Sequence, residues 1–513
     1  MNELNIINIS RYIFLPFIFF YIIHFLPKYK VKNNSINIFG KLSIPLLIIT
    51  YLFFLIILKF SKMSFGNYEF FDAGLILNEI NKTSNFSFIE LVNHYFHHGH
   101  FRPLNIFLIY IFKLFKSFHL IFLIQSLLIT FTTIPIYLIC KKINFDNKMI
   151  FFIITFFLFS PIIGFVDILG FHIDTLVLPI LAYAFYFHLI KDEKKVVIFL
   201  ILLCFVSEVY ILTAAFASLV FFKKKTKKIL LFSLFIVLFI IVFYFLLANN
   251  SINSPSSVFG DNTAYILLKE ISISNFLITF FEIKKIFFFY FFILLFGIFF
   301  IQKISFLIIG IPSIIKILIS TEPYHYDLTG HYANDLFIIC MMSMIFTLVE
   351  LKKTNIKIYN LNKKLIIAGF CSLIVANSIY PFSINFWSKT SAGTYNYKNY
   401  LNEGLTSNNE LKQYLSLNSK EIKQSNICIN NGPFILEVYR KNIDFINFNK
   451  KQECDLIILN IEKNTFMSGS HSSQKEFNEK YHIFKKNIIH SSYNLIIKNK
   501  RYLVYEKKEN TYQ

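Results

Sequence analysis

Long apolar segments, separated by short connections rich in lysine, dominate this chain. A helix needs about 20 mostly apolar residues to cross a bilayer, and no soluble core needs a run such as KIFFFYFF at 285–292. Charged residues make up 16% of the 513 residues, whereas soluble domains carry about 25%. The sequence therefore predicts an α-helical polytopic membrane protein with about 11–13 transmembrane helices.

The individual apolar segments give the expected helices. They lie at 12–26, 43–59, 119–140, 148–165, 171–190, 195–208, 209–222, 229–248, 285–301, 304–320, 334–350 and 364–381. The first has no small-residue cleavage site behind it, so it is interpreted as a retained helix rather than a signal peptide. Residues 195–222 form either one long span or two bent ones. Residues 104–118 carry Lys113 and Lys116, and we interpret them as an interfacial helix whose lysines snorkel.

The lysines also predict the orientation. The lysine-rich connections are 28–41, 141–148, 191–195, 223–228, 302–303 and 351–364. By the positive-inside rule they lie in the cytoplasm. The alternate connections, which hold most of the acids, then face outside; they are 60–103, 166–170, 249–284 and 321–333. The net charge of +21 follows this topology and does not indicate a nucleic-acid partner.

Two domains are expected. Residues 1–381 form the transmembrane domain with its long first outer loop at 60–103, and residues 382–513 form a small extracytoplasmic α/β domain. In this tail, short β-like runs occur at 426–429, 443–448, 456–459, 495–498 and 502–505, with a helical stretch at 434–441. This order favours a partly parallel sheet. The INNGP turn lacks a GxGxxG pattern, so no nucleotide site is predicted.

The six cysteines show no metal-ligand spacing. Cys428 and Cys454 lie in the tail, where a disulfide requires an oxidising compartment. The sequence alone favours two free thiols there.

Polar residues gather in the predicted outer connections and near them. They are Asp72, His94, His97, His98, His100, Arg102, Asp167, His172, Asp174, Glu208, Glu322, His325, Tyr326, Asp327, His331 and Asp335. An ionisable group at membrane depth usually faces a cavity or a partner, which makes Glu208 a stronger candidate than a loop residue. For Asp72, a solvated loop residue and a functional carboxylate are about equally supported.

Arg102 is notable because only four of the 51 basic residues are arginines. Its planar guanidinium suits bidentate contact with phosphate or carboxylate, although an interfacial snorkelling anchor explains it nearly as well. The four histidines between 94 and 100 leave a divalent metal open, but a polar interfacial segment explains their spacing better. Together these groups would suit an amphiphilic substrate with an anionic head, and a carboxylate among them could act as general base.

The order of several motifs resembles a known family. FDAG, HFRP, QSLLITFTTIPIY, GFHIDTLVLP, VSEVY, HYDLTGHY and the tail run DLIILN follow one another as in the bacterial membrane family called domain of unknown function 2079. That family in turn resembles the GT-C superfamily of membrane glycosyltransferases, which use polyprenyl-phosphate-linked sugars. The resemblance implies a bacterial cytoplasmic membrane protein whose partners are a polyprenyl-phosphate lipid, a sugar acceptor and membrane lipid.

The resemblance also implies roles for individual residues. Transfer would be inverting, with Asp72 as the base that deprotonates the acceptor and Glu208 as a second catalytic acid. The expected substrate-binding residues are His100, Arg102, His172, Asp174, His325, Tyr326 and His331. No cofactor is assigned, and the metal remains open.

Two alternatives from other classes stand beside this interpretation. A transporter or flippase for a lipid-linked or anionic solute would place charged residues along a path through the membrane. Apart from Glu208, the predicted spans lack ionisable residues at mid-depth, and no inverted repeat is visible, which weighs against transport. A non-catalytic envelope assembly protein would make the polar outer loops incidental.

Overall fold

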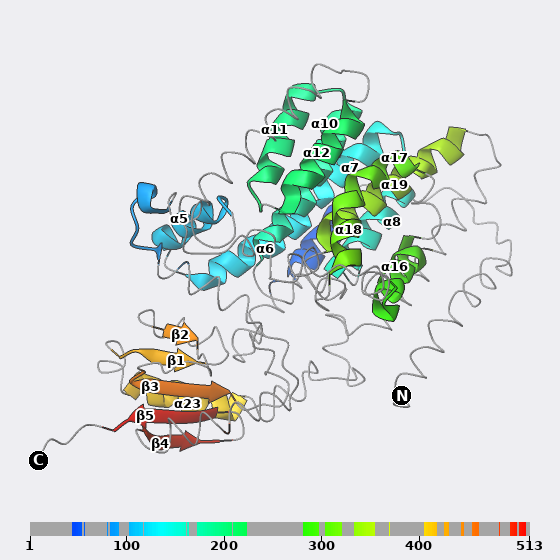
Figure 1. Ribbon diagram of the computed structural model, residues 1–513. Coiled ribbons are helices and arrows are strands. Elements are labelled where there is room, and N and C mark those ends of the chain that lie inside the picture. Colours follow the sequence, from blue (N-terminus) through cyan, green and yellow to red (C-terminus); the bar gives the residue numbers. More distant parts are fainter. Residues whose placement is uncertain are drawn as a thin grey trace, which may run out of the picture.

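The computed structural model of the chain is mostly helical, with one small sheet near the C-terminus (Figure 1). The residues that the structure describes are 44–53, 56, 80, 83–91, 102–115, 117–160, 162–163, 172–207, 209–222, 281–296, 303–320, 333–353, 369, 405–417, 425–429, 443–445, 454–460, 482, 493–499 and 502–508. The predicted helices at 12–26 and 229–248 and the tail helix at 434–441 lie outside these ranges.

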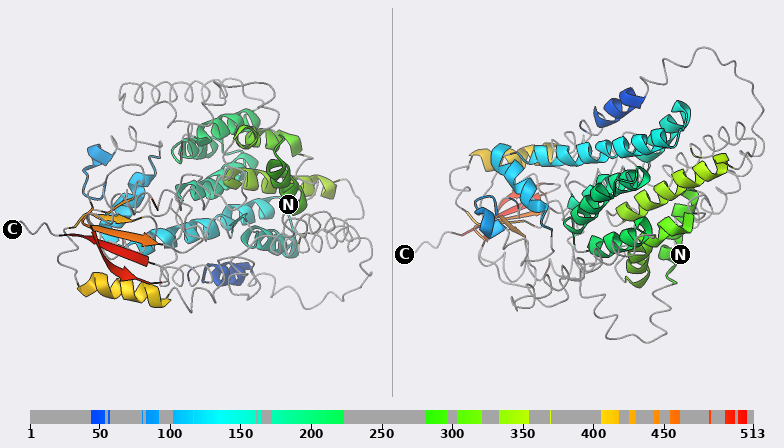
Figure 2. Two further views of the ribbon diagram at one scale, coloured as in Figure 1. Left: turned by 60° about the horizontal axis from the view of Figure 1, so that its bottom comes forward. Right: turned by 90° about the horizontal axis from the view of Figure 1, so that it is seen from above.

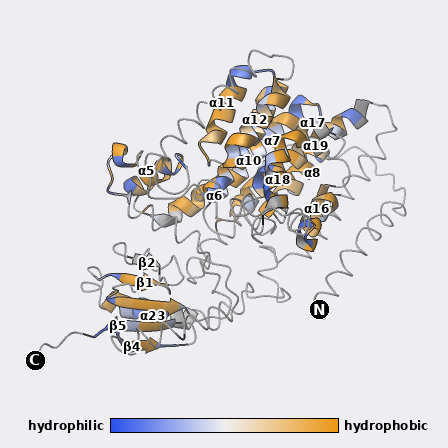
Figure 3. Cartoon of the chain, viewed as in Figure 1, coloured by the Kyte–Doolittle hydropathy of each residue, from blue (hydrophilic) through white to orange (hydrophobic). Residues whose placement is uncertain are grey.

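The helical body contains short and medium-length apolar helices. Beside the helical residues Ile44–Phe53, they are α5 (Asn105–Phe115), α6 (Phe118–Phe131), α7 (Thr133–Lys142), α8 (Asn147–Leu158), η1 (Ile173–Leu176), α10 (Val177–Leu189), α11 (Glu193–Cys204), α12 (Val209–Phe221), α16 (Ile283–Phe296), α17 (Ile304–Leu307), η4 (Ile308–Gly310), α18 (Ile311–Ile319) and α19 (Asn334–Lys353). They coincide with apolar runs of the sequence, and Figure 3 shows that hydrophobic residues dominate them.

One helical rod is long enough and apolar enough to cross a membrane within the described ranges. It covers Leu120–Lys142, because the backbone of Thr132 between α6 and α7 keeps helical angles (Figure 2). It confirms the helix expected at 119–140. Six further apolar helices of 10–17 residues are shorter.

Other helix boundaries differ from those expected. The helix predicted at 148–165 ends at Leu158, after which Phe159 leaves helical geometry. Of the two outcomes expected for 195–222, one long span or two helices, the structure has two helices, α11 and α12. The segment 304–320 is divided by the 3₁₀ turn η4, and Pro312 stands in the first turn of α18, where its missing N–H removes no helical bond.

The core of the helical body lies around α10, which packs against α7, α11 and α19. The fully buried Phe185 on α10 meets the ring of Phe221 on α12 and the ring of Phe306 on α17, both edge to face. Such edge-to-face pairs add about 0.5–1.5 kcal/mol each to the burial of their surface. Segments more than a hundred residues apart are thereby fixed around one helix.

The C-terminal sheet has the order β2-β1-β3-β5-β4. Its strands are β1 (Ile427–Ile429), β2 (Ile443–Phe445), β3 (Leu456–Asn460), β4 (Tyr493–Lys498) and β5 (Tyr502–Lys507). β1 is parallel to both β2 and β3, while β5 is antiparallel to β3 and β4. The expected partly parallel sheet is therefore present. The helix α23 (Leu405–Leu417), which the sequence did not predict, contributes Leu411 and Leu415 to the core on one side of the sheet.

Cys428 and Cys454 form a disulfide, so the preference for two free thiols was wrong. Their Cα atoms lie 5.8 Å apart, with Cys428 in β1 and Cys454 just before the adjacent parallel strand β3. Both cysteines belong to a buried cluster with Ile457, Leu459 and Tyr505 on one face of the sheet. The strand alternation that places these side chains together could not be seen without the register.

The opposite face of the sheet shares a buried apolar cluster with the helical body. This cluster joins Ile427, Leu456 and Val504 to Leu108 and Phe112 of α5. In Figures 1 and 2 the sheet accordingly lies near α5 and the beginning of α6.

Candidate functional site

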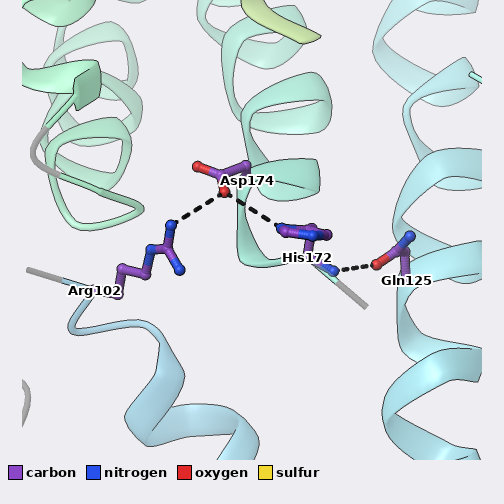
Figure 4. A network of polar contacts seen from close by, with 4 residues as sticks. All are labelled: Arg102, Gln125, His172 and Asp174. Atoms are coloured by element: carbon purple, nitrogen blue, oxygen red, sulfur yellow. Dashed lines mark hydrogen bonds and ion pairs between the residues drawn. The ribbon is translucent and has the colours of Figure 1, made fainter. Parts of the chain in front are cut away.

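Three of the predicted site residues, Arg102, His172 and Asp174, lie within the described residues, and the structure brings them together (Figure 4). The others lie outside the described residues, and they are Asp72, His100, Glu208, His325, Tyr326 and His331.

The centre of the cluster is an ion pair. Nη2 of Arg102 lies 3.7 Å from Oδ2 of Asp174, and the side chains are 19% and 5% exposed. Arg102 directly precedes α5, and its carbonyl oxygen accepts a hydrogen bond from the N–H of Asn105 at 2.9 Å. Asp174 lies in the 3₁₀ turn η1 ahead of α10. A carboxylate this deeply buried needs such a partner, since an isolated charge would be strongly disfavoured.

His172 connects this pair to the long helical rod. Its Nδ1 lies 3.9 Å from Oδ2 of Asp174, and its backbone N–H donates to Oε1 of Gln125 at 2.6 Å. Gln125 lies on α6 and is fully buried. In the sequence Gln125 belongs to the motif QSLLITFTTIPIY, where no role was predicted for it. A lone amide in an apolar helix is a signal that could have found it, because a buried amide requires partners.

Tyr210 extends the cluster toward a second carboxylate. It lies in the first turn of α12, where Asp174, Asp335 and Arg102 are its charged neighbours. Tyr210 is 4% exposed. Sequence analysis did not single it out, since one tyrosine in an aromatic-rich helix carries no distinctive pattern.

Asp335 is buried in the first turn of α19, although the sequence placed it with the polar residues of the last outer loop. Its Oδ2 accepts hydrogen bonds from the hydroxyls of Ser313 on α18 and Thr213 on α12, the latter at 3.3 Å. Its Oδ1 accepts from the backbone N–H of Leu336 at 2.8 Å. The carboxylate of Asp335 therefore joins α12, α18 and α19. It is buried between these helices and does not lie in a loop, as the sequence had indicated.

The cluster lies at one end of the helices, and lysine-rich turns lie at the other. α10 runs from the Asp174 end to the turn that contains Lys191 and Asp192, and α6 and α7 run from the Gln125 end to Lys141 and Lys142. Within the described ranges no three His, Cys, Asp or Glu side chains form a group that could hold a metal ion. The arrangement offers a guanidinium, an imidazole and a phenol beside a buried carboxylate, a set able to bind an anionic group and to hold protons.

The apolar helices, one of which is long and apolar enough to cross a membrane, and the buried ion pair at one end of them are features that a membrane protein would have. The chain belongs to the family described as predicted membrane protein (DUF2079), whose sequence model matches residues 71–479. No curated protein and no solved structure matches the chain.

Proposed function

We propose that this protein is a GT-C-like inverting glycosyltransferase that takes its sugar from a polyprenyl-phosphate donor at the outer face of the bacterial cytoplasmic membrane. The acceptor hydroxyl would lose its proton to Asp72 as its oxygen bonds to the anomeric carbon of the sugar. The bond from that carbon to the phosphate oxygen would break, and the phosphate would leave with the electron pair.

The observation that supports this proposal is the Arg102–Asp174 pair. The carboxylate holds the guanidinium from its buried side, while Arg102 keeps 19% of its side chain exposed. A guanidinium held in this way can present its remaining N–H groups to a phosphate without losing side-chain entropy at each encounter. Nδ1 of His172 approaches the same carboxylate oxygen, at 3.9 Å.

The proposed orientation places several spans across the membrane and the C-terminal sheet outside the cell. The Cys428–Cys454 disulfide supports this orientation, because such bonds persist in oxidising compartments and are rare in the cytoplasm. In this arrangement His100, His325, Tyr326 and His331 would complete the donor site, Glu208 would act beside Asp72, and a divalent cation remains an open part of the proposal.

The proposal is tested in a deletion strain complemented with variants of the full chain. Mass spectrometry of envelope glycans and of lipid-linked sugars should show that Asp72→Asn fails to restore the missing glycan and leaves a lipid-linked sugar accumulated. Asp146→Asn, a change at the lysine-rich end of the helices, is the matched control and should restore both profiles. Full complementation by Asp72→Asn, with the protein present at wild-type levels, would reject Asp72 as the base.

The buried Asp335 favours one alternative, a transporter or flippase. Its carboxylate lies between α12, α18 and α19, and the buried Tyr210 has both Asp335 and Asp174 among its charged neighbours. Asp335→Asn distinguishes the two functions. The measurement is the movement of a fluorescent polyprenyl-phosphate probe across the membrane of proteoliposomes. A loss of this movement in Asp335→Asn, together with wild-type movement in Asp72→Asn, would favour transport over glycosyl transfer.

A further inference from the structure

The helix α5 has two apolar faces, and only one of them is buried. Leu108, Ile109 and Phe112 are at most 2% exposed. By contrast, Phe107 is 65% exposed and Leu114 77%. Phe115 at the end of the helix is also largely exposed. Three large apolar side chains on one helix leave a surface that water covers unfavourably.

A second short element extends this surface. A helical turn at 88–91 begins with a capping box, in which the N–H of Ser87 donates to the Glu90 carboxylate and the N–H of Glu90 donates to the Ser87 hydroxyl. The hydrogen bond from the backbone N–H of Ser87, followed by that from the Ser87 side chain to the same carboxylate, lowers the pKa of Glu90. Phe88 and Ile89 on this turn are exposed.

Lys113 holds the turn and α5 together. Its ammonium group donates to the carbonyl oxygen of Phe86 and lies 5.2 Å from the centre of the Tyr110 ring. Leu91 of the turn and Leu108 of α5 belong to the same buried cluster. We call the exposed side chains Phe88, Ile89, Phe107, Leu114 and Phe115 the α5 platform.

The buried side of α5 is already covered by the soluble part of the chain. Its cluster includes Leu411 and Leu415 of α23 together with Ile427 and Ile429 of β1. The C-terminal sheet therefore accounts for one face of α5, and the platform points away from that core.

A lipid surface suits the platform better than another protein. The 11 residues of α5 extend about 16 Å, which is too short to cross a hydrocarbon core of about 30 Å. Yet α5 ends at Phe115 and α6, the first part of the spanning rod, begins at Phe118. A short apolar helix with a lysine, directly joined to a membrane span, matches the composition of helices that lie in the headgroup region.

We propose that the α5 platform lies in the plane of the membrane surface, with its exposed side chains among lipid acyl chains and its opposite face under the C-terminal sheet. This placement does not depend on glycosyl transfer. It has a consequence for Arg102, whose carbonyl is hydrogen-bonded to the first residue of α5, because it would bring the guanidinium to the depth of lipid phosphates.

The platform can be tested by tryptophan fluorescence in nanodiscs made from phosphatidylcholine and phosphatidylglycerol. The chain's single tryptophan, Trp387, is first replaced by phenylalanine. Phe107→Trp and Phe115→Trp then report from the platform, each as an aromatic replacement at an exposed site. Leu417→Trp, at an exposed position on α23, is the matched control.

We expect lipids brominated near the headgroup to quench both platform tryptophans at least twofold more strongly than lipids brominated near the chain ends. Leu417→Trp should be quenched by aqueous iodide and not by either lipid. Stronger quenching by the deep bromines would show a membrane-crossing segment and overturn the proposal. Iodide quenching at 107 and 115 would overturn it as well, and protection from both quenchers would assign the platform to a second chain or a protein partner.

Discussion

At the scale of single residues, the interaction on which the proposed donor site depends is the ion pair between Arg102 and Asp174. Both charges are largely removed from water, so the pair stabilises the fold only as long as both partners remain. This conditional stability distinguishes a buried pair from an exposed one, such as Lys195 with Asp192 in the turn before α11.

Asp174→Asn should destabilise the protein by about 3 kcal/mol, because it leaves the guanidinium without its buried counter-charge. The free energy of unfolding can be measured by SDS titration of the protein in mixed micelles. The double variant Asp174→Asn/Arg102→Gln removes both charges and should recover at least half of the loss. Equal losses in the single and the double variant would contradict a coupled pair.

Arg102→Lys separates the role of the charge from that of the guanidinium geometry. Lysine keeps the positive charge beside Asp174 and loses the planar fork, so stability should change by less than about 1 kcal/mol. If Arg102 binds a donor phosphate, lipid-linked sugar should nevertheless accumulate in the complemented deletion strain. Wild-type glycans from Arg102→Lys would show that only the charge matters.

Tyr210→Phe tests the link to the second carboxylate. The variant keeps the ring in its buried place and removes only the hydroxyl, whose charged neighbours are Asp174 and Asp335, so we expect a loss of about 1 kcal/mol in the same titration. The tyrosine Tyr183, whose ring stacks on Phe199 away from the site, provides the control. Tyr183→Phe should leave the titration unchanged within about 0.5 kcal/mol.

At the scale of elements, the sequence predicts the helices well where apolar runs meet clear caps. The helix α8 begins where Asp146 accepts a hydrogen bond from the N–H of Met149 at 2.8 Å. The end of α8 carries no such sequence signal, because the apolar run continues past Leu158, and the prediction extended the helix too far. α23 was missed since its sequence, LTSNNELKQYLSL, is polar and mixed.

Asp146→Ala should therefore lower the free energy of unfolding by about 1 kcal/mol through the loss of this cap. Asp146→Asn retains an acceptor oxygen and should remain within about 0.3 kcal/mol of the wild type, which makes it the matched control. A comparable loss in both variants would point to charge rather than capping.

The elements of the candidate site were predictable only in part. Arg102, His172 and Asp174 were selected as polar residues near one membrane face, and the structure joins them in one cluster. Tyr210 was not selected, and Asp335 was selected only as a polar residue of the last outer loop, without its place between three helices. Their position depends on how α12, α18 and α19 pack, and packing between helices leaves no periodic signal in a sequence of apolar residues.

At the scale of the whole molecule, the proposed topology requires that the Arg102 end and the lysine-rich end of the helices face opposite sides of the membrane. The disulfide and α23 lie on the side of the C-terminal sheet, and this sheet shares a core with α5. The C-terminal sheet, α5 and Arg102 are therefore expected on one side, and the turn between α7 and α8 on the other.

Cysteine labelling in intact cells tests this expectation. Cys140, Cys204 and Cys340 are the described cysteines outside the disulfide, and all three are buried. Cys371, which lies outside the described residues, is replaced by serine so that it does not react with the label. Leu417→Cys on α23 should react with a membrane-impermeant maleimide before lysis, whereas Lys142→Cys at the end of α7 should react only afterwards. Both positions are exposed, so the label can reach each of them from its own side. If both reacted before lysis, or if neither did, the sheet end and the lysine-rich end of the helices would lie on the same side of the membrane. The Arg102–Asp174 cluster and the lysine-rich turns could not then face opposite sides of the membrane, which the proposed outer-face donor site requires.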